Sequence, residues 1–363
     1  MKIKLFYLIV CLAIILPITA YSSNTINPKN GVLNANRTLV WYDAALLGIE
    51  GKGWTNTISD YDRLPITAKK KVRKIVWDLS KFSSGLLVRF KTDAKTIKAN
   101  WILTNPELAM LHMPATGVSG IDLYAGNKES ELRFCANGRP HSISNNVKFT
   151  LPVSREYVIY FPTYNGLKSL KIGIPKGKYL SKVFSPARSI VFYGTSITQG
   201  GCASRPGMIT TSIIGRELGL SVINLGFSGN GKMEIELADI ISELNPDIYV
   251  LDTLWNMTPK MVSDRVEPFV KRLRKSHPTT PILLVEDSNF NDLSTVKGNI
   301  LRKIHAKLIK KGDKNLYFLS NKNMLGTDGE ATVDGCHFND LGMMRQADAY
   351  IKFLKPILKN FSQ

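Results

Sequence analysis

The sequence predicts two domains of different class, an all-β sandwich followed by an α/β domain with a parallel sheet. Short apolar runs separated by turn residues fill residues 25–183, which is typical of an all-β domain. From residue 187 to 363, strand-like and helix-like patterns alternate. The chain has 363 residues and is 44% hydrophobic, which is enough to bury a large core in two domains.

Residues 1–20 have the pattern of a signal peptide. Lys2 and Lys4 give a charged start, residues 5–16 an apolar core, and residues 18–20 a small-residue exit. The apolar run is short for a membrane span, and no second long apolar run follows it. We therefore expect an exported protein, periplasmic or secreted, without stable membrane insertion.

The first domain is predicted to be a jelly-roll-like sandwich. Several runs alternate with period two, as residues 74–79 and 157–161 do. Proline and glycine lie between the runs, and no long helical pattern interrupts them. The expected strands are 72–79, 85–90, 96–103, 132–136, 148–151, 157–161 and 170–174.

The second domain begins after a connection at residues 175–186. The expected strands are 189–193, 221–225, 247–252, 281–286 and 316–319. The segments that follow each strand repeat apolar residues at helical spacing, with Pro268 a candidate kink. Strands that alternate with helices pair into a parallel sheet that is covered on both faces. The loops after the first three strands therefore lie at one edge of the sheet.

A serine follows the first of these strands. Residues 188–201 read RSIVFYGTSITQGG, and a helical pattern begins near Met208. A strand, a turn and a helix can lift a nucleophilic hydroxyl, here that of Ser196, to the edge of a parallel sheet. The letters are not those of the G-x-S-x-G elbow, because position 198 is threonine. Taken alone, the turn is better interpreted as a helix N-cap.

Three later segments carry side chains that suit this serine. In residues 333–342, VDGCHFNDLG, Asp334 precedes His337 by three residues and can hold one nitrogen of its ring. The other nitrogen is then free to take a proton from a serine hydroxyl. Gly229 and Asn256 lie after the second and third strands, and backbone N–H groups and Asn amides are typical oxyanion donors.

Ser196, Gly229, Asn256 and His337 follow one another as the four block residues of the SGNH, or GDSL-like, hydrolase family do. The second domain therefore resembles that family. The resemblance implies a flavodoxin-like fold, catalytic Ser196, His337 and Asp334, and an oxyanion hole of Ser196, Gly229 and Asn256. It implies no metal and no cofactor. The first and third blocks differ from the family pattern, reading Gly-Thr-Ser-Ile and Leu-Trp-Asn-Met, but neither change removes a catalytic side chain.

A second resemblance lies in the first domain, where residues 120–124 read GIDLY. They resemble the G-x-D-L-Y signature of the β domain that precedes certain SGNH hydrolases, and Asp122 and Tyr124 are candidate contacts to the second domain. Proteins with both domains resemble bacterial carbohydrate esterases. This implies a serine esterase that works through an acyl-enzyme and deacetylates a polysaccharide or oligosaccharide. A lipid or small-ester acylhydrolase and a non-catalytic glycan-binding protein remain open.

Further residues have two open interpretations. Glu286, Arg205 and Trp255 are candidates for substrate binding, and for Glu286 a strand-end salt bridge is an equal alternative. Asp252 ends a strand and is expected to make a structural hydrogen bond. The aromatic residues Trp41, Tyr42, Trp54 and Tyr61 either stack on sugars or, as we favour, pack the domain.

Metal binding and a disulfide are weaker hypotheses. Asp334, His337 and Asp340 have regular spacing, but with one histidine, and the other histidines in unrelated settings, a metal site is not favoured. Cys202 follows the serine turn and Cys336 precedes His337, so a bridge between them is an alternative to simple packing.

The net charge of +19, or +17 without Lys2 and Lys4, favours acidic partners. The basic residues are spread along the chain without a nucleic-acid motif. We expect an acylated carbohydrate, acidic or neutral, as the substrate and no nucleic acid as a partner. The oligomeric state is not readable from the sequence.

Overall fold

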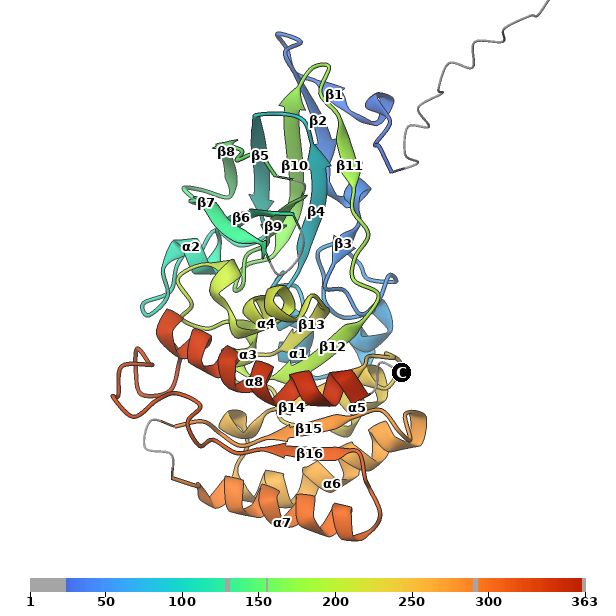
Figure 1. Ribbon diagram of the computed structural model, residues 1–363, viewed down its shortest axis with the longest axis vertical. Helices are drawn as coiled ribbons and strands as arrows, with labels where there is room; N and C mark the ends of the chain where they lie inside the picture. Colours follow the sequence, from blue (N-terminus) through green and yellow to red (C-terminus); the bar gives the residue numbers. More distant parts are fainter. Residues whose placement is uncertain (1–23, 128–130, 155, 290–292, 361–363) are drawn as a thin grey trace, which may run out of the picture.

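The computed structural model describes residues 24–127, 131–154, 156–289 and 293–360. The expected signal peptide, residues 1–20, lies outside the described residues. No helix in the described part of the chain is long and apolar enough to cross a membrane. Figure 1 shows a β domain at one end of the long axis and an α/β domain at the other.

Two antiparallel sheets form the β domain. One has the order β1 (Val32–Leu33), β2 (Leu39–Asp43), β10 (Leu167–Pro175), β5 (Thr96–Leu103) and β8 (Ser144–Thr150). The other has the order β11 (Leu180–Lys182), β4 (Leu87–Thr92), β9 (Glu156–Tyr160), β6 (Ile121–Gly126) and β7 (Arg133–Gly138), with β3 (Ile49–Glu50) paired to β4. Strands from distant parts of the chain, such as β2 and β10, are neighbours, as in a jelly roll. The predicted sandwich is confirmed.

The inner faces of the two sheets share one core. Phe90, Trp101 and Ile172 are buried in it, as period-two strands require. Of the four early aromatic residues, Tyr42, Trp54 and Tyr61 are at most 9% exposed. Their interpretation as packing residues is therefore confirmed.

The strand expected at residues 72–79 is wrong, because this segment forms the helix α1 (Lys74–Leu79). The letters KIVWDL fit period two, but the residues that become buried are Val76, Trp77 and Leu79, which lie on one helical face. They pack against the α/β domain rather than in the sandwich. Tertiary packing thus overrides the local alternation.

The α/β domain contains one parallel sheet with helices on both faces. Its strand order is β13 (Ser221–Gly226), β12 (Ser189–Gly194), β14 (Ile248–Asp252), β15 (Ile282–Val285) and β16 (Leu316–Leu319). One face packs against α4 (Thr210–Leu218) and α8 (Asp340–Asn360), and the other against α5 (Ile235–Ile241), α6 (Pro259–Ser276) and α7 (Val296–Lys310). This is the flavodoxin-like order, in which β12 lies at the switch point between β13 and β14. The predicted fold is confirmed.

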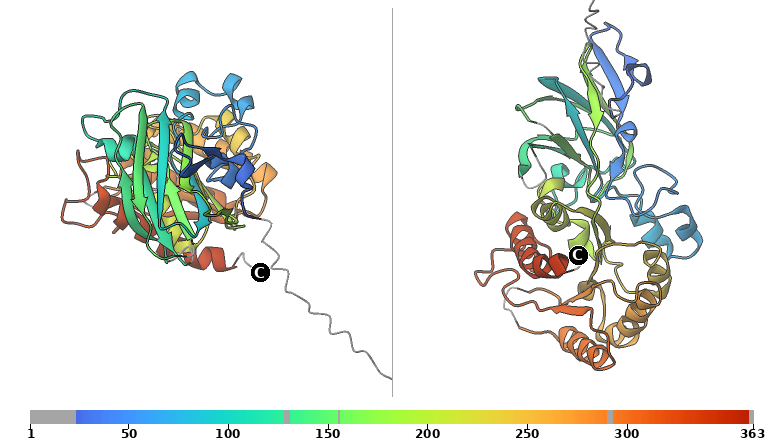
Figure 2. Two further views of the ribbon diagram at one scale, coloured as in Figure 1. Left: turned by 90° about the horizontal axis from the view of Figure 1, so that it is seen from above. Right: turned by 45° about the vertical axis from the view of Figure 1, so that its right-hand side comes forward.

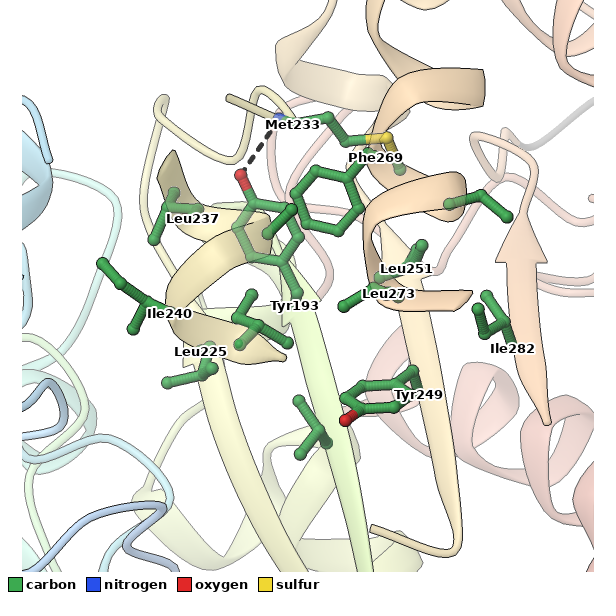
Figure 3. Close-up of a cluster of buried hydrophobic side chains, with 14 of the residues drawn as sticks. Tyr193, Leu225, Met233, Leu237, Ile240, Tyr249, Leu251, Phe269, Leu273 and Ile282 are labelled. Atoms are coloured by element: carbon green, nitrogen blue, oxygen red, sulfur yellow. Dashed lines mark hydrogen bonds between the residues drawn. The ribbon is translucent and has the colours of Figure 1, made fainter. Parts of the chain in front are cut away.

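The buried cluster under α5 and α6 fixes the loop after β13 (Figure 3). The rings of Tyr193 on β12 and Phe269 on α6 are stacked, with centroids 5.4 Å apart. The N–H of Met233 donates to the Tyr193 hydroxyl over 3.0 Å, so this buried phenol is satisfied. The hydrogen bond attaches the end of the β13 loop to the strand that precedes Ser196.

The segment between β3 and β4 joins the two domains. In the right-hand view of Figure 2 it lies, in blue, beside the α/β domain. Its Trp54 indole donates to Glu243 over 2.9 Å. The buried guanidinium of Arg63 donates to the carbonyl oxygens of Asn224 and Gly226 over 3.1 and 2.7 Å. The β domain therefore holds the end of β13, from which the next active-site loop starts.

Candidate active site

Ser196 lies where β12 ends and a short helix begins. Thr195 is the N-cap of α3 (Ser196–Gln199) and forms a capping box with Thr198, so the N-cap interpretation is correct for the residue before the serine. Ser196 is the first helical residue, and its N–H belongs to those that a helix leaves unbonded. Its side chain thus stands at the carboxyl edge of the sheet, beside an N–H group that is directed out of the helix.

Asp334, His337 and Ser196 form one hydrogen-bonded chain. The Ser196 Oγ lies 3.0 Å from His337 Nε2. On the other side of the ring, His337 Nδ1 lies 2.7 Å from Asp334 Oδ2. Asp334 Oδ1 also accepts the N–H groups of Cys336 and His337, over 3.0 and 2.7 Å. The spacing expected from the sequence therefore yields the geometry that a nucleophile, a base and a group that orients the base require.

The Asp334 carboxylate is stabilised in its charged form. Partial burial favours the neutral acid, but the side chain and N–H of His337 and the N–H of Cys336 outweigh that effect and lower the pKa of Asp334 to about 2. Asp334 is therefore ionised at neutral pH. A negative charge at this position is suited to stabilise an imidazolium at His337.

The two expected oxyanion loops meet beside Gly194. Gly229 has a φ of +68°, a conformation that favours glycine, and it turns the loop after β13. A Cβ on Gly231 would lie 2.1 Å from the Gly194 carbonyl oxygen, so only glycine lets this loop approach the end of β12. The N–H of Gly231 donates to Asn256 Oδ1 over 3.1 Å. That bond orients the Asn256 amide and leaves its Nδ2 hydrogens for another acceptor.

Three donors are thereby available for an oxyanion. They are the N–H groups of Ser196 and Gly229 and the side-chain amide of Asn256, in η6 (Leu254–Asn256). None of the three donates in the backbone or side-chain hydrogen bonds that the described residues make near the site. Donors fixed before the reaction stabilise developing negative charge without reorganisation, which is the property that an oxyanion hole needs.

Sequence reasoning missed two residues that the β domain contributes. His112 was placed in an unrelated setting, yet its ring centroid lies 5.5 Å from that of His337. The buried Tyr164 hydroxyl donates to the Ser196 carbonyl oxygen over 3.0 Å. Neither residue lies in a local motif, so the only usable signal was the GIDLY segment, which predicts a contact between the domains.

The metal set that the sequence analysis did not favour is not assembled. Asp334 holds the ring of His337, whereas Asp340 accepts the N–H and hydroxyl of Ser204 over 2.8 and 2.5 Å. A different set, His112, Cys202 and His337, has ligand atoms within 4.8 Å of one another. Burial, together with nearby Asp334 and Cys336, raises the pKa of the Cys202 thiol to about 12, which disfavours the thiolate that a metal would bind. A metal ion there would also compete with Ser196 for His337.

Glu286 has a structural position. Its carboxylate is buried and accepts from Arg302 over 3.0 Å, from the N–H of Asn321 over 3.3 Å, and from the Ser294 hydroxyl. It does not meet Arg205. Of the two open interpretations, the structure supports the strand-end salt bridge and not contact with a substrate.

Arg205 and Trp255 differ in position. Arg205 lies in the domain interface, where it donates to Asp122 Oδ2 and to the Tyr124 hydroxyl over 2.9 and 2.7 Å. The expected contact of the GIDLY segment with the second domain is therefore confirmed, and Arg205 is not free to bind a substrate. Trp255 is half-buried beside Asn256, with the Lys297 Nζ 5.4 Å from its ring centroid, and remains a candidate.

The remaining sequence hypotheses concern Cys202, Cys336 and Asp252. Cys135, Cys202 and Cys336 are free thiols in the structure. The bridge that was left open between Cys202 and Cys336 is therefore not formed. Asp252 accepts the Tyr350 hydroxyl over 2.9 Å, which confirms its structural hydrogen bond.

The jelly roll, the flavodoxin-like domain and the hydrogen-bonded Ser–His–Asp chain define a hydrolase of carboxylic esters. Residues 187–355 match the model of the GDSL-like lipase/acylhydrolase family. Residues 39–180 match the model of the N-terminal domain of SGNH hydrolase-type esterases. None of the curated proteins compared with the chain matches it.

Solved structures agree with the family models. A structure from Bacteroides ovatus, described as a GDSL-like lipase, is 32% identical, covers 88% of this chain and 98% of its own, and has a TM-score of 0.82. The chain belongs to the SGNH, or GDSL-like, hydrolase family. A salicylyl-acyltransferase from a tetracycline biosynthetic pathway is 19% identical over 90% of this chain and 97% of its own, with a TM-score of 0.69. A family two carbohydrate esterase from Clostridium thermocellum, in complex with cellohexaose, is 12% identical over 76% of this chain and 92% of its own, with a TM-score of 0.51. The last two show the fold alone.

Proposed function

We propose that the protein is an exported serine esterase that removes acyl groups from a polysaccharide or oligosaccharide. The observation that carries the proposal is the Ser196 Oγ–His337 Nε2 distance of 3.0 Å, with Asp334 on the opposite ring nitrogen. The carbohydrate part is supported by the likeness in fold to carbohydrate esterases and by the signal-like residues 1–20.

In the proposed mechanism, His337 Nε2 takes the proton of Ser196 as Oγ bonds to the ester carbonyl carbon. The carbonyl oxygen becomes negative and is held by the N–H groups of Ser196 and Gly229 and by Asn256 Nδ2. When this intermediate collapses, the carbon–oxygen bond to the alcohol breaks and His337 gives the alcohol its proton. Water then attacks the acyl-Ser196 ester with His337 as base, which releases the acid and restores Ser196. No residue in this sequence of steps requires a cofactor.

The test is acid release from 4-nitrophenyl acetate and from a panel of acetylated polysaccharides. We expect Ser196→Ala to lower kcat/KM by about 10⁴-fold or more while the fold stays intact, because the nucleophile is lost. Ser276→Ala, at the exposed end of α6, is the matched control and should keep full activity. Unchanged activity in Ser196→Ala would rule out the mechanism.

The panel also separates the substrate classes. Release from a polysaccharide supports the carbohydrate esterase, and release from the small ester alone favours the lipid or small-ester acylhydrolase. Polysaccharide binding without hydrolysis, and without labelling of Ser196 by a fluorophosphonate, would instead indicate a glycan-binding protein.

A further inference from the structure

We propose that an apolar pocket between the two domains binds the acyl group of the substrate, and that the preferred acyl group is larger than acetyl. The inference rests on the proposed esterase function. It changes the expected acyl group from acetyl to an alkyl or aromatic one.

The pocket has a volume of about 780 Å³ and apolar walls. Phe82, Leu79 and Val118 from the β domain line it, with Met110 and Leu111 at the tip of the loop that follows β5. This volume lies in the range of about 300–1,000 Å³ that is typical of small-molecule sites, which also have mostly apolar walls and few polar groups. An acetyl methyl group would leave nearly all of this space unfilled.

Large apolar side chains stand exposed around this pocket. Leu111 is fully exposed, and Met110 and Ile75 are each 45% exposed. Exposed apolar side chains that gather at one pocket are a feature of binding sites, unlike single ones scattered over a surface. An apolar group that enters the pocket would remove these side chains from water, which is the driving force that the proposal requires.

Two polar residues connect the pocket to the loops that carry Ser196 and Gly229. Ser228, which lines it, directly precedes Gly229 of the proposed oxyanion hole. Tyr164, which also lines it, donates to the Ser196 carbonyl oxygen over 3.0 Å. One wall of the pocket is therefore adjacent in sequence to Gly229 of the proposed oxyanion hole, and another is one hydrogen bond from the backbone of Ser196.

The chemistry decides which half of the ester faces the pocket. His337 gives its proton to the leaving alcohol, so the alcohol must lie on the histidine side. Within the described residues, the pocket walls include Ser228, which precedes Gly229 of the oxyanion loop, and no member of the segment 330–340; Leu111 precedes His112, whose ring lies beside that of His337. The acyl group is the half that we assign to the pocket, because the wall at Ser228 adjoins the oxyanion loop.

The test compares kcat/KM for 4-nitrophenyl acetate, butyrate, hexanoate and benzoate, so that the leaving group stays constant. In the wild type we expect a rise of about fourfold for each methylene added up to hexanoate, from the transfer free energy of a buried CH₂. Ala109→Trp fills the pocket from an exposed position and should abolish this rise while keeping activity on acetate. Leu111→Asp should flatten the profile because it makes the wall polar.

Phe184→Asp is the matched control, since Phe184 is 81% exposed and does not line the pocket. It should leave the chain-length profile unchanged. A flat profile in the wild type, or a rise that survives Ala109→Trp in a folded variant, overturns the assignment of the pocket. Absence of hydrolysis for all four esters, with Ser196 unlabelled by a fluorophosphonate, is a different result and overturns the esterase function itself.

Discussion

Two aspartates near the serine loop show how the two regions of the molecule differ. Asp334, in the histidine loop, has a side chain that is 40% exposed and holds His337 Nδ1. Asp122, at the domain interface, is fully buried and holds Arg205 over 2.9 Å and the N–H of Gly207 over 2.8 Å. Hydrogen bonds lower the pKa of the Asp334 carboxyl group, whereas burial raises the pKa of the Asp122 carboxyl group.

This difference in burial and pKa separates a proposed role in the reaction, for Asp334, from a role in holding the two domains together, for Asp122. Asp334 can be removed without leaving a fully buried charge, because its side chain is 40% exposed and that of His337 is 25% exposed. Removing Asp122 leaves the Arg205 guanidinium, with 19% of its side chain exposed, without its carboxylate. The first residue should therefore govern turnover and the second should govern stability.

Of the changes that test this comparison, Asp334→Asn is expected to have the largest effect. The amide cannot stabilise the imidazolium and favours the wrong ring tautomer, so kcat should fall by about 10²–10⁴-fold. The urea midpoint should shift little, because Asp334 is largely exposed. Steady-state kinetics and urea unfolding of the same preparation test both statements, and near wild-type turnover would contradict the role of Asp334.

For Asp122→Ala we expect a loss of stability with little loss of turnover. Loss of one member of a buried ion pair should lower the free energy of unfolding by about 3–5 kcal/mol. The folded fraction should keep kcat within about tenfold of the wild type, because Asp122 touches no reacting group. Urea unfolding with active-site titration measures the two quantities, and a large loss of kcat with unchanged stability would reverse the comparison.

A third carboxyl group, Asp252, sharpens the comparison because it is buried and forms no salt bridge with any residue that the structure describes. Burial raises its pKa to about 6 despite hydrogen bonds from Tyr350, Thr198 and Gln346. The folded state thus binds the proton more tightly than the unfolded chain, so the free energy of unfolding should fall as pH rises from about 4 to about 6. The expected loss is roughly 2–3 kcal/mol, and it remains above pH 6.

Asp252→Asn cannot titrate and should remove this part of the pH dependence. Urea unfolding of the wild type and the variant at pH 4, 5, 6 and 7 gives the comparison. Parallel curves for the two proteins would show that Asp252 does not carry the effect.

The smallest effect is expected for His112→Ala. The variant removes the β-domain ring beside His337, and the loss of one ring contact should lower kcat/KM by about two- to tenfold. His141→Ala, also exposed and in the β domain, is the control and should have no effect. Equal kinetics for the two variants would confine the active site to the α/β domain.

Local sequence patterns were sufficient to predict most helices and strands. They also predicted the candidate site residues that follow the ends of strands. The strand β16 (Leu316–Leu319) has the predicted bounds, and the three-residue spacing of Asp334 and His337 places both on one loop with the required contact. The helix α1 was missed because KIVWDL fits both periods, and its partner surface on the α/β domain is distant in the sequence. Glu286 could not be assigned for a similar reason, since its partner Arg302 comes from a helix whose rotation is set by packing.

The sequence by itself indicated the two fold classes, because strand periodicity and strand-end loops are local properties. The resemblance to the SGNH family gave the order of the candidate site residues Ser196, Gly229, Asn256 and His337. The tertiary structure decided what surrounds those residues. His112 beside His337, Tyr164 under Ser196 and the pocket at Leu111 all arise where the β domain meets the α/β domain. Such contacts depend on how two folded surfaces fit together, which no spacing within one segment encodes.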